Sequence, residues 1–446
     1  MQRKRNPGSR RNYRKNFQYD KPLAPDDERR VAMNDARGDY NSKRLLRELG
    51  MDVDARRLRV VPVGQCILFG GHRGCGKSTE LRAIAAELVG PERFLVVSID
   101  TLQALDINNL TYADVALALA ASVEQAGITV PEVFQTPLHG WFREVSRNTA
   151  LTTSLTGEVK AGVKAEPGLP FVGKLFASLT AAIRSNTTYK TEIRESVRNS
   201  FSVLARGLNK LLSFVDSEVS KQGKGHAVIV VDGTDCLRGD EPDDFFVRDS
   251  HQLRQLRGNC IYCAPIGVLN EQGQVGQNFD AIFRLPMVKL AEKCQPEPLP
   301  VAWRRLREFV HRRLPAENFD DPATLDRLIA HSGGHPRDLL RLVNLCFQEI
   351  DQGPISGQVA ATAARRLTNE YQRWVRFDDF ALLARIDRAG SDYAPVTEQT
   401  RRLLYDLALL EHNSYWWQSH PAVRALDGYR AKESRLALSA DELSPS

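Results

Sequence analysis

The sequence predicts an α/β protein in which a three-layer sandwich with a parallel sheet is followed by a helical lid and a winged-helix-like domain. Three observations support this class. Short, mainly apolar runs recur up to residue 288, as expected for parallel strands that are covered on both faces. Segments with apolar residues at the helical period separate these runs. After residue 295 the helical period continues alone until a short pair of strands near residue 410.

The length and composition exclude several classes of protein. With 446 residues, 42% of them apolar and 26% charged, the chain is too long for one compact core and too apolar to be disordered throughout. No apolar run approaches the roughly 18 residues of a membrane span, and the basic N-terminus lacks the apolar core of a secretory signal. Seven cysteines do not form a disulfide framework, and the apolar run around Cys260 and Cys263 favours buried thiols over a zinc site. We therefore expect a cytoplasmic protein that does not bind membranes.

The elements follow from these patterns in chain order. The predicted strands lie at 65–70, 94–100, 226–231, 260–266 and 281–288. A long amphipathic helix is expected over 188–220, because apolar residues recur there every three or four positions. Residues 151–165 alternate as in a hairpin or an irregular flap, and the role of 140–187 stays open. The expected domains are a basic disordered tail over 1–30, a core over 31–295 with a helical insertion at about 140–222, a lid over 296–352, the winged-helix-like domain over 353–430 and a tail over 431–446.

The strongest chemical signal follows the first strand. Gly71, Gly76, Lys77 and Ser78 have the spacing G-x-x-x-x-G-K-S, and a helical pattern begins directly afterwards. This is the pattern of a phosphate-binding loop, or P-loop. Its glycines let backbone N–H groups turn toward an anion, the helix adds its dipole, the Lys reaches the β- and γ-phosphates and the Ser ligates Mg²⁺. The predicted nucleotide-binding residues are Gly71, Gly74, Cys75, Gly76, Lys77, Ser78 and Thr79.

An acidic partner for the metal is expected where the strand at 226–231 ends. Because ligands of open α/β sheets lie beyond the carboxyl ends of the strands, Asp232 should bind Mg²⁺ together with Ser78. Asp235 is the candidate to orient the attacking water, and its alternative role is a turn or helix-cap carboxylate. We expect ATP as the nucleotide. GTPases usually recognise guanine with an Asn/Thr-Lys-x-Asp element, and the partial match at 209–212 lacks the Asp.

The region after residue 295 contains a second candidate phosphate ligand. In the run Gly-Gly-His-Pro-Arg at 333–337, Pro336 suits the first turn of a helix, where the dipole disfavours a cation such as Arg337. Contact with a nucleotide phosphate would explain Arg337, and pairing with Asp338 or another acid is the alternative. Helical patterns at 377–388 and 398–410, then paired strands at 407–411 and 415–418 around a turn at 412–414, describe a winged helix that binds DNA or packs on protein.

These motifs together resemble the AAA+/STAND branch of P-loop ATPases, where STAND denotes signal-transduction ATPases with numerous domains. The resemblance rests on residues 71–79, 230–235 and 333–337. It implies that Asp232 is the Walker B acid, that residues 334–336 open a lid helix and that Arg337 is the sensor-2 arginine. The chain departs from the pattern at Gly233, where most AAA+ enzymes have Glu, and lacks a polar sensor-1 residue after 260–266. These departures favour slow hydrolysis, and the unranked candidates for an arginine finger are Arg254, Arg257 and Arg284.

Two functional hypotheses from different classes follow. In the first, ATP with Mg²⁺ holds the core, lid and winged-helix-like domain in one arrangement, and hydrolysis or exchange releases them. The resemblance implies a role in bacterial signalling or anti-phage defence, with a protein partner or further copies of the chain. The alternative is a DNA-binding AAA+ ATPase of the replication-initiator or transposition type. A metabolic kinase is disfavoured, because no acceptor-substrate site is evident.

The net charge of +6 comes from the N-terminus. Residues 1–21 contain eight Lys and Arg residues and one acid, so the other 425 residues carry 53 bases and 54 acids. The composition of this arm predicts disorder. A basic arm attracts nucleic acid or an acidic partner without sequence specificity, so the charge bears on the choice of partner and not on the ATP chemistry.

Overall fold

The computed structural model describes residues 11–60, 64–105, 110–122, 128–148, 187–270, 272–295, 297–350, 352–390, 395–413 and 416–441. They form two compact units, and each unit draws on several parts of the chain. Unit 1 contains the chain up to Asn41, Gly71–Arg82 and the chain from Arg284 onward, whereas unit 2 contains Ser42–Gly70 and Ala83–Phe283. The sequence predicted one core over 31–295. Residues 71–82, which hold the loop predicted to bind phosphate, count with the N-terminal and C-terminal parts of the chain in unit 1.

Unit 2 is built on a five-stranded parallel sheet flanked by helices, as the sequence predicted. The strands are β3 (Cys66–Gly71), β4 (Phe94–Asp100), β5 (His226–Asp232), β6 (Asn259–Pro265) and β7 (Ala281–Leu285), in the order β4-β5-β6-β3-β7. Register aligns Asp100 with Asp232, so two neighbouring strands end in carboxylates at one edge. The ends of β3 and β7 count with unit 1. A small antiparallel pair joins β1 (Met51–Asp52) to β2 (Arg57–Leu58).

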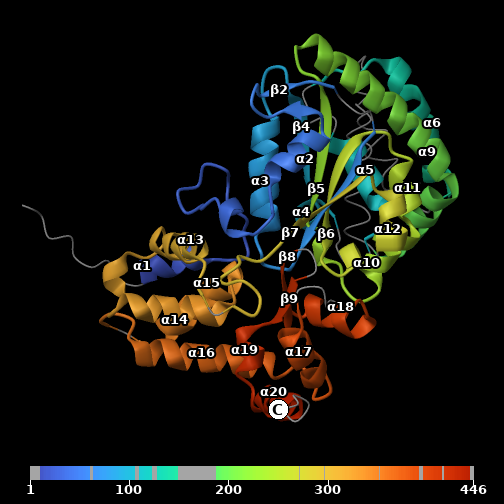
Figure 1. Ribbon diagram of the computed structural model, residues 1–446. Helices are drawn as coiled ribbons and strands as arrows, with labels where there is room; N and C mark the ends of the chain where they lie inside the picture. The colour runs from blue at the N-terminus through green and yellow to red at the C-terminus, as the bar shows by residue number, and fades with distance from the viewer. Residues whose placement is uncertain are drawn as a thin grey trace, which may run out of the picture. The chain divides into compact units, whose positions relative to one another are not determined.

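Helices pack around the sheet. The longer ones are α2 (Ser42–Glu48), α3 (Lys77–Leu88), α5 (Tyr112–Ser122), α6 (Glu132–Asn148) and α9 (Thr187–Lys221). Shorter ones are α4 (Thr101–Ala104), α10 (Glu241–Asp243), α11 (Ser250–Arg254) and α12 (Gln272–Asn278). Figure 1 shows α6 alongside α9. The helix predicted over 188–220 is confirmed as α9, whereas the alternating segment at 151–165 lies outside the described residues.

The N-terminal segment differs from the disordered tail that its composition predicted. Residues 11–14 form α1 (Arg11–Arg14), and a short 3-10 turn over Lys15–Phe17 follows. Phe17 is fully buried and packs edge-on against Phe347, with the ring centroids 5.5 Å apart. The Arg14 guanidinium donates to the Phe347 carbonyl at 2.6 Å. One buried aromatic side chain and the hydrogen bonds around it therefore order a segment that is otherwise polar.

The described residues of unit 1 after Leu285 are mainly helical and include an antiparallel pair of strands. The helices are α13 (Pro300–His311), α14 (Pro322–Ser332), α15 (Pro336–Glu349), α16 (Gly357–Tyr371), α17 (Asp379–Arg388), α18 (Glu398–Tyr405), α19 (Pro421–Arg424) and α20 (Asp427–Asp441). Side chains cap several of these helices, such as Asp321 before α14 and Thr397 in the capping box of α18. The predicted strand pair is present as β8 (Leu409–Asn413) and β9 (Trp416–Ser419).

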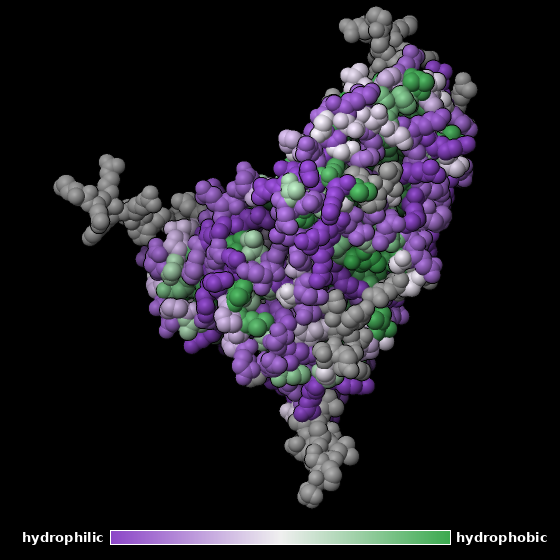
Figure 2. Space-filling view, turned by 45° about the horizontal axis from the view of Figure 1, so that its top comes forward, coloured by the Kyte–Doolittle hydropathy of each residue, from purple (hydrophilic) through white to green (hydrophobic). Residues whose placement is uncertain are grey.

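One predicted boundary in this region was wrong. The helical pattern at 398–410 ends at Tyr405, because Leu407 adopts a φ of +61° and Leu409 enters β8. Within the C-terminal tail expected over 431–446, α20 continues as far as Asp441, and this helix packs on α17. Figure 2 shows a mainly hydrophilic face with scattered hydrophobic residues. Among the described residues, we find no helix that combines the length and the apolar character needed to cross a membrane.

Candidate nucleotide-binding site

The P-loop, residues 71–77, joins the buried strand β3 to α3. Gly74 and Gly76 have φ angles of +83° and +104°, the left-handed conformations that the glycine spacing predicted. A Cβ atom on Gly74 would lie 2.7 Å from Nε2 of His335 and 2.8 Å from Cβ of Arg337. These two residues therefore approach the loop so closely that only glycine fits at position 74.

The lysine of the P-loop forms hydrogen bonds with the backbone of the loop itself. Lys77 is 4% exposed, and its Nζ donates to the carbonyls of Gly71 and His72 at 2.9 and 2.8 Å. Both acceptors precede Lys77 by five or six residues, so these hydrogen bonds hold the loop against the start of α3.

A pocket in unit 1 lies against this loop. Its lining comes from the N-terminal segment, the P-loop and the start of α3, α13 with the residues after it, and α15. The cavity volume is about 120 Å³, below the roughly 300–1,000 Å³ of ligand pockets. The pocket therefore has space for a phosphate group, and a whole nucleotide requires lining side chains to move. Five lining residues are cationic and one is acidic; the cations are Lys21, Arg30, Arg37, Arg313 and Arg337, and the acid is Glu80.

The structure brings several predicted site residues together at this pocket. The P-loop and the Gly-Gly-His-Pro-Arg run at 333–337 are neighbours in space, because Arg337 lines the pocket from the first turn of α15. The predicted nucleotide-binding residues that also line it are Gly74, Cys75, Gly76 and Thr79. Those that belong to the same unit but are not among the lining residues are Gly71, Lys77 and Ser78.

Arg37 is a site residue that the sequence analysis missed. It is 5% exposed, and its NH2 group donates to the Cys75 carbonyl at 2.7 Å while NH1 donates to the carbonyl of Pro286. The backbone N–H of Leu23 also reaches this part of the site, where it donates to Oγ1 of Thr79 at 3.2 Å. Arg37 lies in a stretch without a periodic or motif signal, so only the tertiary fold reveals it.

Arg313 is a second basic residue that no motif predicted. It is 4% exposed, lies over the Phe309 ring at 4.1 Å and donates from NH1 to the carbonyls of Arg29 and Phe309, each at 2.8 Å. Its Nε atom has no hydrogen-bond partner in the described part of the chain. Burial lowers the pKa of Arg313 to about 10, which leaves the side chain charged at neutral pH. Arg313 therefore adds a permanent positive charge to the pocket wall.

A buried histidine connects the P-loop with the C-terminal elements. His72 is fully buried; its Nδ1 lies 3.0 Å from the Leu404 carbonyl, and its Nε2 accepts from the N–H of Glu411 at 2.8 Å. A carbonyl can only accept, so Nδ1 carries the proton and Nε2 is bare. Burial lowers the pKa of His72 well below its usual range, which agrees with this neutral form. The P-loop backbone is thereby tied to α18 and β8.

The two predicted acidic residues lie in unit 2 at the end of β5. Asp232 accepts from the Gly233 N–H at 2.9 Å, and ligand atoms of Asp232, Asp235 and Cys263 all lie within 4.8 Å of one another. Thr101 donates to the backbone carbonyl of Asp232 at 2.9 Å. The strand end thus gathers two carboxylates, as the sequence predicted, and a thiol that it did not include.

Gly233 gives a physical reason for the absence of a glutamate after Asp232. Its φ is +92°, and a Cβ atom would lie 2.6 Å from Oγ1 of Thr101. A side chain at this position would be both strained and crowded.

Two of the three candidates for an arginine finger already form ion pairs. Arg254 pairs with Asp280 at 3.0 Å in unit 2, and Arg284 pairs with Glu411 at 3.4 Å in unit 1. Either side chain would have to leave its carboxylate before it could reach a phosphate.

No family model matches this sequence, and no curated protein matches it significantly. The lining residues fit a phosphate group, because they include five cations, a glycine turn and Thr79. Oxygen ligands of the kind that Mg²⁺ prefers are present at Ser78 in unit 1 and at Asp232 in unit 2.

Proposed function

We propose that this chain is an AAA+/STAND-type regulatory ATPase that binds ATP with Mg²⁺, hydrolyses it slowly and acts as a nucleotide-dependent switch. The observation that carries the proposal is the cationic pocket of unit 1, where the glycine loop and Arg337 meet although they are far apart in the sequence. A pocket with five cations and one acid favours a multiply charged anion over a neutral or cationic ligand.

Different residues of unit 1 contribute to binding the phosphates of the nucleotide. Backbone N–H groups of the P-loop hold phosphate oxygens, and Lys77 exchanges its loop carbonyls for the β- and γ-phosphates. Arg337 neutralises charge from the side of α15, while Arg37 and Arg313 add fixed positive charge to the wall. Within unit 1, Ser78 is the residue that would hold Mg²⁺, which would supply charge neutralisation to the phosphates when bound.

Hydrolysis, in this proposal, depends on Asp235, which orients the attacking water. The residue after Asp232 cannot supply a second carboxylate, because Gly233 has a left-handed conformation and no space for a side chain. Slow turnover suits a switch, in which the lifetime of the bound nucleotide sets the lifetime of the state.

The switching element would be the C-terminal part of unit 1. His72 bonds the P-loop directly to α18 and β8. A loop that rearranges around a nucleotide would therefore either move α18 and β8 with it or break these two hydrogen bonds. Differential contacts of this kind are what a ligand needs in order to shift a conformational equilibrium. The partner that responds would be another protein or another copy of this chain.

The test is Lys77→Ala, which should abolish ATP binding measured by isothermal titration calorimetry with Mg²⁺. Removing Nζ takes away the charge that the proposal assigns to the β- and γ-phosphates. Lys210→Ala, at an exposed position of α9, is the matched control and should bind as the unaltered chain does. Undiminished ATP binding by a folded Lys77→Ala variant would reject the site.

A DNA-binding AAA+ ATPase is the second candidate, because eight of the basic residues lie within positions 1–21. The described part of that segment already uses two of them inside unit 1. Arg14 donates to the Phe347 carbonyl, and Lys21 lines the pocket. The other six bases of the segment, which are Lys15 and the five that precede Arg14, are therefore the ones that this candidate needs.

A further inference from the structure

A buried arginine of the pocket wall has no carboxylate partner in the described part of the chain. Arg313 is 4% exposed and lies two residues beyond the end of α13. No acid among the described residues forms an ion pair with its guanidinium. Burial lowers the pKa of Arg313, and the charges of Arg29 and Arg312 lower it further, against the opposing charge of Asp27. Arg313 is thus a cation in surroundings of mainly positive charge.

The carboxylates of this region are engaged by other cations. Asp27 accepts from Nε and NH2 of Arg29 at 2.9 and 2.7 Å, in a bidentate pair. Glu80, the acid among the pocket-lining residues, pairs with Arg30 at 4.0 Å. Neither carboxylate therefore neutralises Arg313, and a buried charge without a counter-charge is energetically costly.

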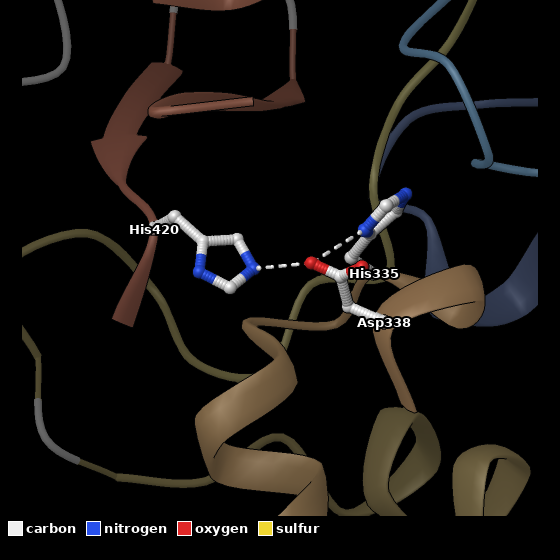
Figure 3. A group of neighbouring side chains, drawn as sticks. All are labelled: His335, Asp338 and His420. Atoms are coloured by element: carbon white, nitrogen blue, oxygen red, sulfur yellow. Dashed lines mark ion pairs between the residues drawn. The ribbon is translucent and has the colours of Figure 1, made fainter. Parts of the chain in front are cut away.

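A buried charge of opposite sign in the same unit is compensated by its neighbours. Asp338 is fully buried, and Arg341 donates to its Oδ1 at 2.7 Å. Figure 3 shows the rings of His335 and His420 directed at this carboxylate, each with one nitrogen 3.4 Å from Oδ2. The described residues supply no comparable group of opposite charge to Arg313, so an anion from solution is the remaining source of one.

The Arg313 guanidinium is held in place with part of its hydrogen-bonding capacity unused. NH1 donates to the carbonyls of Arg29 and Phe309, each at 2.8 Å, and the group lies over the Phe309 ring at 4.1 Å. Nε has no hydrogen-bond partner among the residues that the structure describes. Because these contacts fix the guanidinium before a ligand binds, little side-chain entropy is lost when it binds an anion.

The cavity that Arg313 lines has the size and the chemistry for a phosphate group. Its volume is about 120 Å³, and Gly74 and Gly76 of the P-loop line it together with Arg313. The planar guanidinium matches the geometry of phosphate oxygens, and a glycine turn offers them backbone N–H groups. A small tetrahedral oxyanion therefore suits this cavity better than a neutral ligand does.

We propose that Arg313 is a phosphate-binding residue, whose guanidinium contacts the same phosphate group as the glycine turn of the P-loop. One phosphate group accounts for both contacts, because the cavity has space for one. The proposal rests on the proposed function in placing phosphate in this pocket, but it requires only the tetrahedral anion and not ATP. The source of the anion is either a nucleotide or free phosphate.

A purely structural role for Arg313 is the alternative, because its bond to the Arg29 carbonyl holds the N-terminal segment. Arg312 separates the two roles. Its guanidinium donates to the carbonyls of Glu28 and Arg30 in the same segment, at 3.1 and 2.5 Å, but Arg312 is not among the pocket-lining residues. Arg312→Gln thus weakens the attachment of the segment without removing a cation from the cavity.

The test is isothermal titration calorimetry of the full chain with inorganic phosphate and with pyrophosphate, in a buffer free of phosphate and sulfate. Arg313→Gln should weaken the binding of pyrophosphate about ten- to hundredfold, the loss expected for hydrogen bonds to a charged group. Arg312→Gln should bind as the unaltered chain does. Equal affinity in Arg313→Gln and the unaltered chain, or an equal loss in both variants, overturns the proposal.

Arg313→Lys covers the case in which Arg313→Gln does not fold. Lysine keeps the charge but lacks the planar fork and the Nε donor, so it is not an equivalent phosphate ligand. Arg313→Lys should bind pyrophosphate more weakly than the unaltered chain, and thermal melting verifies that each variant is folded. A folded Arg313→Lys chain with undiminished affinity contradicts direct contact by the guanidinium.

Titration with ATP separates this proposal from the proposed function. Arg313→Gln should lose affinity for ATP by about the factor that it loses for pyrophosphate, and a loss for ATP alone overturns the phosphate role. Pyrophosphate binding that depends on Arg313, in a chain that does not bind ATP, rejects the proposed function and retains this proposal. Equal ATP affinity in Arg313→Gln and the unaltered chain rejects Arg313 as a ligand and leaves the proposed function. A chain that binds none of the three anions rejects both.

Discussion

Gly233 shows how a single backbone conformation limits the chemistry available at the end of β5. A left-handed φ of +92° combines here with a Cβ position 2.6 Å from the Thr101 hydroxyl oxygen. Gly239 also has a positive φ, of +57°, yet nothing lies within 4 Å of its Cβ position. Gly233 therefore combines backbone strain with crowding, whereas Gly239 has the strain alone.

We expect Gly233→Glu to lower stability rather than to restore a faster ATPase. Strain and crowding together should reduce the free energy of unfolding by about 1–3 kcal/mol, and Gly239→Ala should cost less because it carries the strain alone. Urea unfolding of both variants measures the difference. A Gly233→Glu chain that is as stable as the unaltered one and hydrolyses ATP faster would contradict this account of the missing glutamate.

At the scale of elements, the N-terminal segment is held to unit 1 at several places. Phe17 packs on Phe347 of α15, and the Leu23 N–H donates to Thr79 at the start of α3. Arg313 adds a third link through the Arg29 carbonyl. The segment thus runs past the pocket and supplies part of its wall, which a tail identified by composition alone would not do.

We expect Phe17→Ala to release this segment without unfolding the helices beneath it. Removing a fully buried aromatic ring typically lowers the free energy of unfolding by about 3–5 kcal/mol in a core. Detaching the segment should require less free energy than this, so we expect local detachment. Hydrogen exchange should become faster at the backbone N–H groups of Leu23, Asp27 and Arg30, which are bonded in the structure. Tyr19→Ala, at a 40% exposed residue, is the control. Unchanged exchange in Phe17→Ala would show that Phe17 does not anchor the segment.

At the scale of the whole molecule, buried neutral histidines make stability depend on pH. Burial lowers the pKa of both His331 and His412 to about 4, from an ordinary value near 6.5. Between these values the unfolded chain binds more protons than the folded one, so stability falls as the pH decreases from about 6.5 to 4. The melting temperature should drop across this window.

His412→Leu should flatten this dependence. His412 is 4% exposed, and its Nδ1 has no hydrogen-bond partner among the described residues, so the variant removes a buried polar atom together with the titration. Melting curves at a series of pH values compare the slopes. Identical slopes in the variant and the unaltered chain would mean that His412 does not contribute.

The net charge of the molecule bears on its partner. Replacing Arg3, Lys4 and Arg5 with Gln leaves Arg14 and Lys21 in place, so ATP binding should not change. If the chain binds duplex DNA, the same variant should bind it more weakly and with a shallower salt dependence, by roughly 0.9 for each lost phosphate contact. A full-length chain that does not bind duplex DNA at low salt would exclude the DNA-binding candidate.

The parts predicted correctly from the sequence were those with a strong local pattern. Apolar runs located the strands of the sheet, the helical period located α9, and the glycine spacing indicated the left-handed turns at Gly74 and Gly76. Helix ends were less predictable: α18 stops at Tyr405 because the following residues enter β8, a preference that depends on pairing with β9.

The sequence by itself determined the glycine turns between β3 and α3, the carboxylates that follow β5 and the helical character of the C-terminal region, because each depends on neighbouring residues and backbone conformation. Only the tertiary structure decided that Arg37, Arg313 and the N-terminal segment line the pocket with Arg337. It also placed Nε2 of His335 3.0 Å from the Arg73 carbonyl and Nδ1 3.4 Å from the Asp338 carboxylate of α15. Contacts between residues so far apart in the chain leave no periodic or spacing signal, since they arise from packing and burial rather than from local conformation.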